Sequence, residues 1–133
     1  LTGKADRVLV DAPCSGLGTL RRAPDIKWRT SAADLAAYAV QQAAILRAAA
    51  ALVKPGGRLV YATCSLLVEE NEAVAEAFSA DERDFVPLHA GERLAALKVP
   101  GADTLATAAG HLRLWPHRHG TDGFFAALWQ RKA

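Results

Sequence analysis

Two stretches of the chain share one pattern: an apolar run, a small polar turn, and then residues that favour a helix. The first run is Arg7–Ala12 and the second is Arg58–Ala62. Both are short and rich in leucine and valine, which is typical of buried strands in a parallel sheet. Between them, Ser31–Val53 places apolar residues at helical spacing, with Gln42 as the polar interruption on that face. The pattern predicts a strand–helix–strand unit.

The ends of this helix carry recognisable signals. Ser31 is the expected N-cap, and Asp34 falls in the first turn, where the helix dipole favours an acid. The stretch Lys54-Pro55-Gly56-Gly57 is expected to end the helix, because proline and glycine are stop signals. Upstream of the helix, Ser15–Arg29 is predicted to be a long, basic, irregular loop that contains Pro24.

The remainder of the chain predicts one more helix and three short strands. The helix is expected over Val68–Ala80, with Glu69, Glu70 and Glu72 near its positive end. The expected strands are Phe85–Leu88, His111–Trp115 and Phe124–Gln130, whereas His89–Ala109 shows no assignable pattern. Strands that alternate with helices predict an α/β fold with a parallel sheet, to which the last strands add an antiparallel element at one side.

Composition narrows the class of protein. The 133 residues suffice for one domain, and 51% hydrophobic with 23% charged residues is a globular composition. Two cysteines do not make a secreted disulfide scaffold, and neither a leader peptide nor a membrane segment is visible, so a cytoplasmic location is expected. Because the chain starts at Leu1 and a strand follows almost at once, we interpret it as the C-terminal part of a longer protein.

Candidate chemistry gathers where the two predicted parallel strands end. Cys14 follows the first strand and Cys64 follows the second, so both sulfurs are expected at one rim of the sheet, where open α/β proteins bind ligands. Backbone N–H groups at a helix start would stabilise a thiolate at Cys64, which favours a nucleophile over an inert buried thiol. Asp11 is either a loop anchor or a polar group that faces a ligand.

A basic segment follows the first cysteine. Its arginines suit phosphate groups, and its tryptophan offers a face for a nucleic-acid base, although an ordinary solvated surface is the alternative. The candidate RNA contacts are Arg21, Arg22, Lys27, Trp28 and Arg29. Gly16–Arg21 mimics a dinucleotide-binding loop but lacks its third glycine. No metal is expected, because neither the cysteines nor His117 and His119 have the spacing of a structural site.

Three motifs together resemble the RNA cytosine-5 methyltransferase family. They are DAPCSG at Asp11–Gly16, TCS at Thr63–Ser65 and RLWPHRHGTDGFF at Arg113–Phe125. The segments GTLRRAPDIKWR and LVKPGGRLVYATCS are similar to the bacterial 16S ribosomal RNA members of that family. The resemblance covers nearly the whole chain, apart from about His89–Ala109.

This resemblance implies a Rossmann-like domain that uses S-adenosylmethionine. Cys64 would attack C6 of a flipped-out cytosine so that C5 can take the methyl group, and Cys14 would assist release of the product. Asp11 and Pro13 would lie by the cofactor, and Phe124 or Phe125 would form part of the wall of the base pocket. DNA cytosine-5 methyltransferases use the proline–cysteine motif as the nucleophile, so spacing alone leaves the reverse assignment open.

The family's glycine-rich cofactor loop and ribose-binding acid lie upstream of the PCSG motif and do not occur here. We therefore expect residues 1–133 to be the C-terminal half of a catalytic domain, which alone neither binds S-adenosylmethionine measurably nor methylates RNA. Arg7–Ala12 would then be an exposed sheet edge through which the chain self-associates. A non-catalytic RNA-binding module and a thiol oxidoreductase that pairs Cys14 with Cys64 stay open as alternatives.

Overall fold

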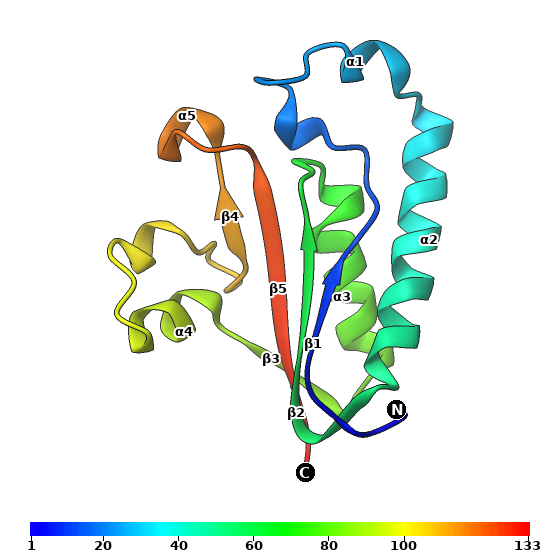
Figure 1. Cartoon of the computed structure of the whole chain (residues 1–133), viewed down its shortest axis with the longest axis vertical. Coiled ribbons are helices and arrows are strands. Elements are labelled where there is room, and N and C mark those ends of the chain that lie inside the picture. The colour runs from blue at the N-terminus through cyan, green and yellow to red at the C-terminus, as the bar shows by residue number, and fades with distance from the viewer.

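The sheet is mixed, and its strands run in the order β1-β2-β5-β3 in a computed structural model that describes residues 1–133 (Figure 1). β1 and β2 are parallel, whereas β5 is antiparallel to β2, to β3 and to the short β4. The strands are β1 (Ala5–Asp11), β2 (Val53–Thr63), β3 (Phe85–Leu88), β4 (Leu112–Leu114) and β5 (Phe124–Arg131). The helices are α1 (Ile26–Arg29), α2 (Ala32–Ala50), α3 (Glu72–Asp81), α4 (Ala90–Ala96) and α5 (Pro116–His119).

The antiparallel strands lie on one side of the parallel pair β1–β2, as predicted. Among them, β5 lies between β2 and β3, with Tyr61 opposite Ala127. The reason is its composition: Phe125–Ala127 and Trp129 are buried, which suits a strand with neighbours on both sides. β1 is left as an edge strand, and its Leu9 is 68% exposed.

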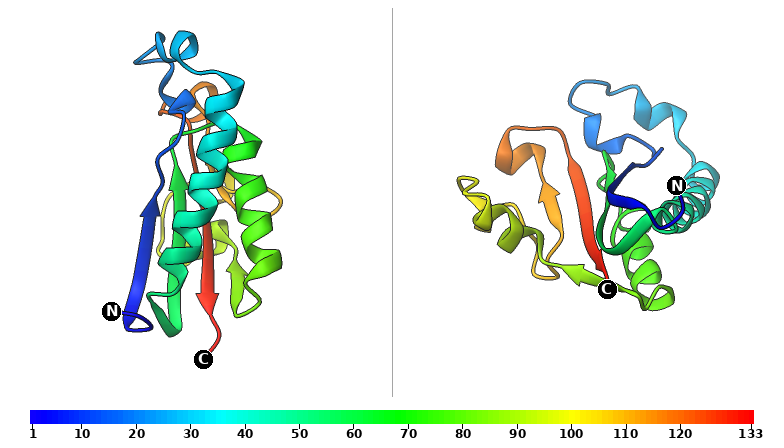
Figure 2. Two further views of the ribbon diagram at one scale, coloured as in Figure 1. Left: turned by 90° about the vertical axis from the view of Figure 1, so that its right-hand side faces the viewer. Right: turned by 60° about the horizontal axis from the view of Figure 1, so that its bottom comes forward.

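Two helices cover one face of the sheet, and α4 lies against the other (Figure 2). The core between the sheet, α2 and α3 contains Leu46, Leu59 and Tyr61. In the same core, the Phe78 ring packs edge-on against Trp129 and Phe85, at centroid distances of 4.8 and 5.4 Å. Such aromatic pairs add to the stabilisation that burial of the rings provides. No helix of the chain is both long and apolar enough to cross a membrane.

The start of α2 is as predicted, and its end is not. Ser31 caps the helix in a reciprocal box with Asp34. The helix ends at Ala50, earlier than Val53, and the expected stop signal lies inside β2. There the chain bulges between the pairs Ala5–Val53 and Arg7–Arg58, and Gly56 takes the left-handed φ of +77° that the bulge needs. The proline and glycines therefore shape a strand.

Three other segments contain short elements that their sequence pattern does not predict. The predicted helix Val68–Ala80 is a 3-10 turn at Val68–Glu70 followed by α3. The basic loop holds a 3-10 turn at Leu17–Thr19 and α1. The unassigned region holds α4 and a 3-10 turn at Ala102–Thr104. These elements are too short to show a full period of apolar residues, so tertiary contacts determine them.

Candidate active site

The two cysteine loops meet at the carboxyl ends of β1 and β2, at the top of Figure 1. Because the strands are parallel and Asp11 pairs with Ala62, the loops leave the sheet side by side. The Sγ atoms of Cys14 and Cys64 lie 3.4 Å apart, and both thiols are free and half-buried. The prediction that both sulfurs share one rim is confirmed.

The environment of Cys14 keeps its thiol protonated. Burial, together with the hydrogen bond shared with Cys64, raises the pKa of Cys14 from 9.0 to about 12. A thiol that keeps its proton can donate a hydrogen bond to a neighbouring sulfur. The arrangement can therefore use Cys14 as the donor and Cys64 as the acceptor.

A buried carboxylate, Glu70, lies beneath both loops. It accepts hydrogen bonds from the backbone N–H of Ser15 at 2.8 Å and from the Ser15 hydroxyl at 2.7 Å. It also accepts from the hydroxyl of Ser65 and from Nε2 of Gln42 at 3.3 Å. Gln42 is fully buried, and the same nitrogen donates to the Pro13 carbonyl at 2.9 Å. The polar interruption of the helix face is thus a part of the site.

Asn71 holds the TCS loop from the same side. Its Nδ2 donates to the Ser65 carbonyl at 2.8 Å, and its Oδ1 accepts from the Thr63 hydroxyl at 2.5 Å. The Tyr61 hydroxyl donates to the backbone carbonyl of Glu70 at 2.5 Å. Burial and the nearby Glu70 charge raise the pKa of Tyr61. Neither Glu70 nor Asn71 is among the site residues predicted from sequence, where the acids of this segment were expected to lie near the positive end of a helix. The helix in fact begins at Glu72.

Gly18 connects the DGFF turn (Asp122–Phe125) to the TCS loop by backbone hydrogen bonds. The Gly18 N–H donates to the Cys64 carbonyl at 2.8 Å, and the Gly123 N–H donates to the Gly18 carbonyl at 2.7 Å. A Cβ at Gly18 would lie 2.4 Å from the Gly123 oxygen and 2.6 Å from the Cys64 oxygen. Only glycine therefore allows the three backbones to approach this closely.

Two of the candidate RNA contacts are tied to the same turn. Arg21 Nε lies 2.9 Å and Arg22 Nη2 lies 2.7 Å from the Asp122 carboxylate. Hydrogen bonds from the two arginines hold the pKa of Asp122 below its usual value. The pairs partly neutralise both cations and fix the basic loop over the site.

The rest of the basic loop is open to solvent. Trp28 is 81% exposed, and the Lys27 ammonium lies 5.0 Å from the centroid of its ring. Arg29 pairs with Asp25 at 2.9 Å. Trp28 therefore has ring surface open to solvent, and α1, which carries it, lies at the same end of the sheet as the cysteine loops (Figure 1).

The expected cofactor and base contacts divide into exposed and buried residues. Asp11 and Pro13 are exposed at the end of the edge strand, and Asp11 takes part in none of the chain's ion pairs. Phe124 is half-buried. Phe125 is fully buried and packs edge-on against Tyr61, at a centroid distance of 6.5 Å. Phe125 therefore belongs to the core, and of the two phenylalanines only Phe124 can meet a base.

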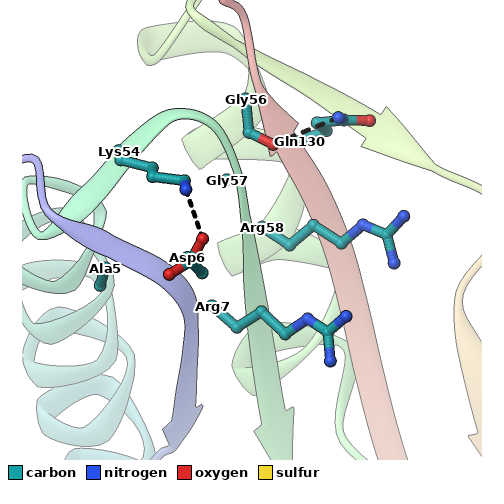
Figure 3. A pocket seen from close by; sticks show the side chains of 8 residues that line it. All are labelled: Ala5, Asp6, Arg7, Lys54, Gly56, Gly57, Arg58 and Gln130. Carbon is teal, nitrogen blue, oxygen red and sulfur yellow. Dashed lines mark hydrogen bonds and ion pairs between the residues drawn. The ribbon is translucent and has the colours of Figure 1, made fainter.

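A wide polar hollow of about 740 Å³ lies at the opposite end of β2 from the cysteines (Figure 3). An ion pair between Lys54 and Asp6 spans it, and the side chains of Arg7 and Arg58 lie side by side along its lower edge in Figure 3. No thiol, histidine or hydroxyl group lines it. Its amine and one carboxylate, Lys54 and Asp6, are paired with each other, so the thiol rim is the better candidate for chemistry.

Comparison with known proteins identifies the family. The matching family model describes the 16S rRNA methyltransferase RsmB/F and covers residues 1–130 of this chain. The chain belongs to the RsmB/F family. Its relatives include the probable ribosomal RNA small subunit methyltransferase B of Synechocystis sp., 45% identical over 92% of this chain and 26% of the relative. The probable methyltransferase B of Bacillus subtilis is 43% identical over 96% of this chain and 28% of the relative.

A solved structure extends the RsmB/F comparison to the fold. NSun6 from Pyrococcus horikoshii, solved with SFG, matches with a TM-score of 0.71 and 30% identity over 98% of this chain and 31% of that one. The predicted α/β class of a Rossmann-like methyltransferase is therefore confirmed. The chain spans about a quarter of the length of the RsmB/F relatives named above.

Proposed function

We propose that this chain is the chemical half of an enzyme that methylates C5 of cytosine in 16S ribosomal RNA. The observation that carries the proposal is the pair of free thiols, 3.4 Å apart at the carboxyl ends of two parallel strands, in a member of the RsmB/F family. Cytosine C5 is a weak nucleophile, and a covalent bond to C6 divides one difficult substitution into easier steps.

Cys64 makes that bond. Its thiolate attacks C6, the S–C6 bond forms, and the electron pair of the C5–C6 double bond moves to C5. S-adenosylmethionine, when bound, would supply an electrophilic methyl group to C5, and the electron pair of the broken methyl–sulfur bond would stay on its sulfur. Loss of the C5 proton to a base then restores the double bond, the S–C6 bond breaks, and its electron pair returns to Cys64 as a thiolate.

Cys14 assists the last step. Its thiol keeps its proton at neutral pH and lies within 3.4 Å of the sulfur that must leave C6. A hydrogen bond from Cys14 stabilises the charge that develops on the Cys64 sulfur as the bond breaks. The TCS motif at Thr63–Ser65, through its resemblance to the RNA cytosine-5 methyltransferases, favours this division of roles over the reverse one.

The residues of this chain fit one part of the cofactor. Asp11 is an exposed carboxylate at the end of a parallel strand, and it would hold the ammonium group of the methionine portion, with Pro13 beside it. The SFG in the NSun6 structure is an analogue of S-adenosylmethionine. Because nothing else in this chain covers Asp11, we expect the isolated 133 residues to bind the cofactor too weakly to measure.

RNA would approach over the basic loop. Trp28 offers an exposed face for base stacking, and Lys27, Arg21, Arg22 and Arg29 place positive charge around it. Phe124 would line the pocket for the flipped base. A binding module without chemistry would need neither thiol, and the methyltransferase family argues against a thiol oxidoreductase, although the sulfur distance alone would suit one.

The test is methyl transfer by the intact protein to 16S ribosomal RNA, with the nucleosides identified by mass spectrometry. The wild type should produce 5-methylcytosine. Loss of a nucleophile removes most of the rate, so Cys64→Ser should lower the yield by about a thousandfold or more. Methylation at another atom, or full activity of Cys64→Ser, would overturn the proposal.

A further inference from the structure

Glu70 is a buried carboxylate with no cation beside it. It lies at the end of the 3-10 turn Val68–Glu70, is fully buried and takes part in no ion pair. Its four contacts are all donors, three of which come from Ser15 and Ser65. Burial of a carboxylate is unfavourable, and an apolar side chain of similar size would fill the space at lower cost. The packing of the core therefore does not account for an acid here.

Its hydrogen bonds reach the residue that follows each cysteine. Ser15 follows Cys14, and Ser65 follows Cys64. One carboxylate oxygen, Oε2, accepts from both hydroxyls, whose oxygens lie 3.4 Å apart. The two sulfurs above them are separated by the same 3.4 Å. A single atom thus fixes one loop against the other, immediately beside the thiols.

We propose that Glu70 is a positioning residue that sets the distance between the Cys14 and Cys64 thiols. The proposal rests on the function proposed above, in which Cys14 acts on the sulfur of Cys64. The backbone bond from Gly18 N–H to the Cys64 carbonyl also joins the two loops, but among the buried side chains around them only Glu70 binds both. Asn71 binds only the TCS side, and Gln42 reaches only the Pro13 carbonyl and Glu70 itself.

Two substitutions should loosen this link to different degrees. Glu70→Ala removes the acceptor of four hydrogen bonds, although Gln42 Nε2 keeps the Pro13 carbonyl and the two serine hydroxyls keep each other. The loops are then held together less tightly beside the thiols. Glu70→Gln keeps the size and one acceptor oxygen. Its NH2 group can face the serine hydroxyls only if these turn to accept, which is possible because a hydroxyl is both donor and acceptor. The expected order of thiol proximity is wild type, Glu70→Gln, Glu70→Ala.

Dibromobimane measures this proximity directly, because it fluoresces strongly only after joining two thiols. Each sulfur displaces one bromide, so two C–S bonds form, and two bromide ions and two protons are released. Displacing a reacting group by about 1 Å can slow a reaction about a hundredfold. We therefore expect Glu70→Ala to slow the second, intramolecular step by about tenfold or more and Glu70→Gln by about threefold. Glu69→Gln, an exposed neighbour, is the matched control and should react like wild type.

Cys14→Ser must give no fluorescence, and urea unfolding verifies that each variant is folded. Wild-type rates in folded Glu70→Ala would overturn the proposal. If that variant does not fold, wild-type rates in Glu70→Gln would overturn it. The assay contains neither RNA nor cofactor, so its result stands apart from methylation. In the intact enzyme, kcat should fall in the same order while KM for RNA stays unchanged, because Glu70 is buried and touches no substrate.

Discussion

Replacing Gly18 with alanine should separate the three loops of the site. The new Cβ would meet backbone atoms of Gly123 and Cys64 at 2.4 to 2.8 Å, and backbone cannot move aside as a flexible side chain can. Two hydrogen bonds depend on the same contact, Gly18 N–H to Cys64 and Gly123 N–H to Gly18. Either the backbone becomes strained and keeps these two hydrogen bonds, or the loop that contains Gly18 moves away and both are lost.

Both outcomes should destabilise the folded protein by a similar free energy. Forcing an extra methyl group into a packed site costs about 1–3 kcal/mol. If the loop moves instead, two hydrogen bonds of about 1 kcal/mol each are lost. We therefore expect Gly18→Ala to lower the free energy of unfolding by about 2 kcal/mol, which is roughly a thirtyfold change in the folding equilibrium.

Urea unfolding measures this change, and Gly3→Ala is the control. Gly3 has a left-handed φ of +67° but nothing within 4 Å of a new Cβ, so its variant should lose only about 1 kcal/mol from the backbone conformation. Gly18 lies outside the left-handed region, so its loss comes from close approach alone. Hydrogen exchange at the Gly123 amide should also accelerate. If Gly18→Ala lowers the free energy of unfolding no more than Gly3→Ala does, and exchange at the Gly123 amide is unchanged, close approach at Gly18 does not hold the loops together.

Two further predictions concern the sheet edge and the Cys14 thiol. Leu9 is 68% exposed on the edge strand β1, so the chain should self-associate at high concentration. In light scattering, Leu9→Lys should shift the protein toward the monomer. A wild type that stays monomeric would contradict this. Because burial and the Cys64 hydrogen bond raise the pKa of Cys14 from 9.0 to about 12, the folded state keeps a proton that the unfolded chain releases above pH 9. The free energy of unfolding should therefore fall as the pH rises from about 9 to 12, and less steeply in Cys14→Ser; parallel curves for the two proteins would count against the shift.

The parallel pair and its helix could be predicted from local pattern. The apolar runs, the Ser31 cap and the polar turns each depend on residues close in sequence, and together they place both cysteines at one rim. The place of β5 between β2 and β3 could not be derived in this way. Its apolar run predicts a buried strand, but which strands flank it depends on contacts with Tyr61 and Pro87, far away in the chain.

The chemistry of the site was predictable only in part. Cys14, Cys64 and Asp11 stand out because each interrupts or ends an apolar run. Glu70 does not, since Glu69 and Glu72 look the same in sequence. What distinguishes Glu70 is its contact with Ser15, 55 residues away. The pairing of Arg21 with Asp122 across 101 residues is equally invisible to local pattern, as is the burial of Phe125 beside the half-buried Phe124.

Trapping the covalent intermediate would show whether Cys64 attacks and Cys14 releases. Cys14→Ser in the intact protein, incubated with RNA and S-adenosylmethionine, should accumulate a protein–RNA adduct that survives denaturation. Trypsin separates the two sites, since Cys14 falls in the peptide 8–21 and Cys64 in the peptide 59–83. We expect the nucleotide on the peptide with Cys64. An adduct that accumulates in Cys64→Ser instead, attached through Cys14, would contradict this.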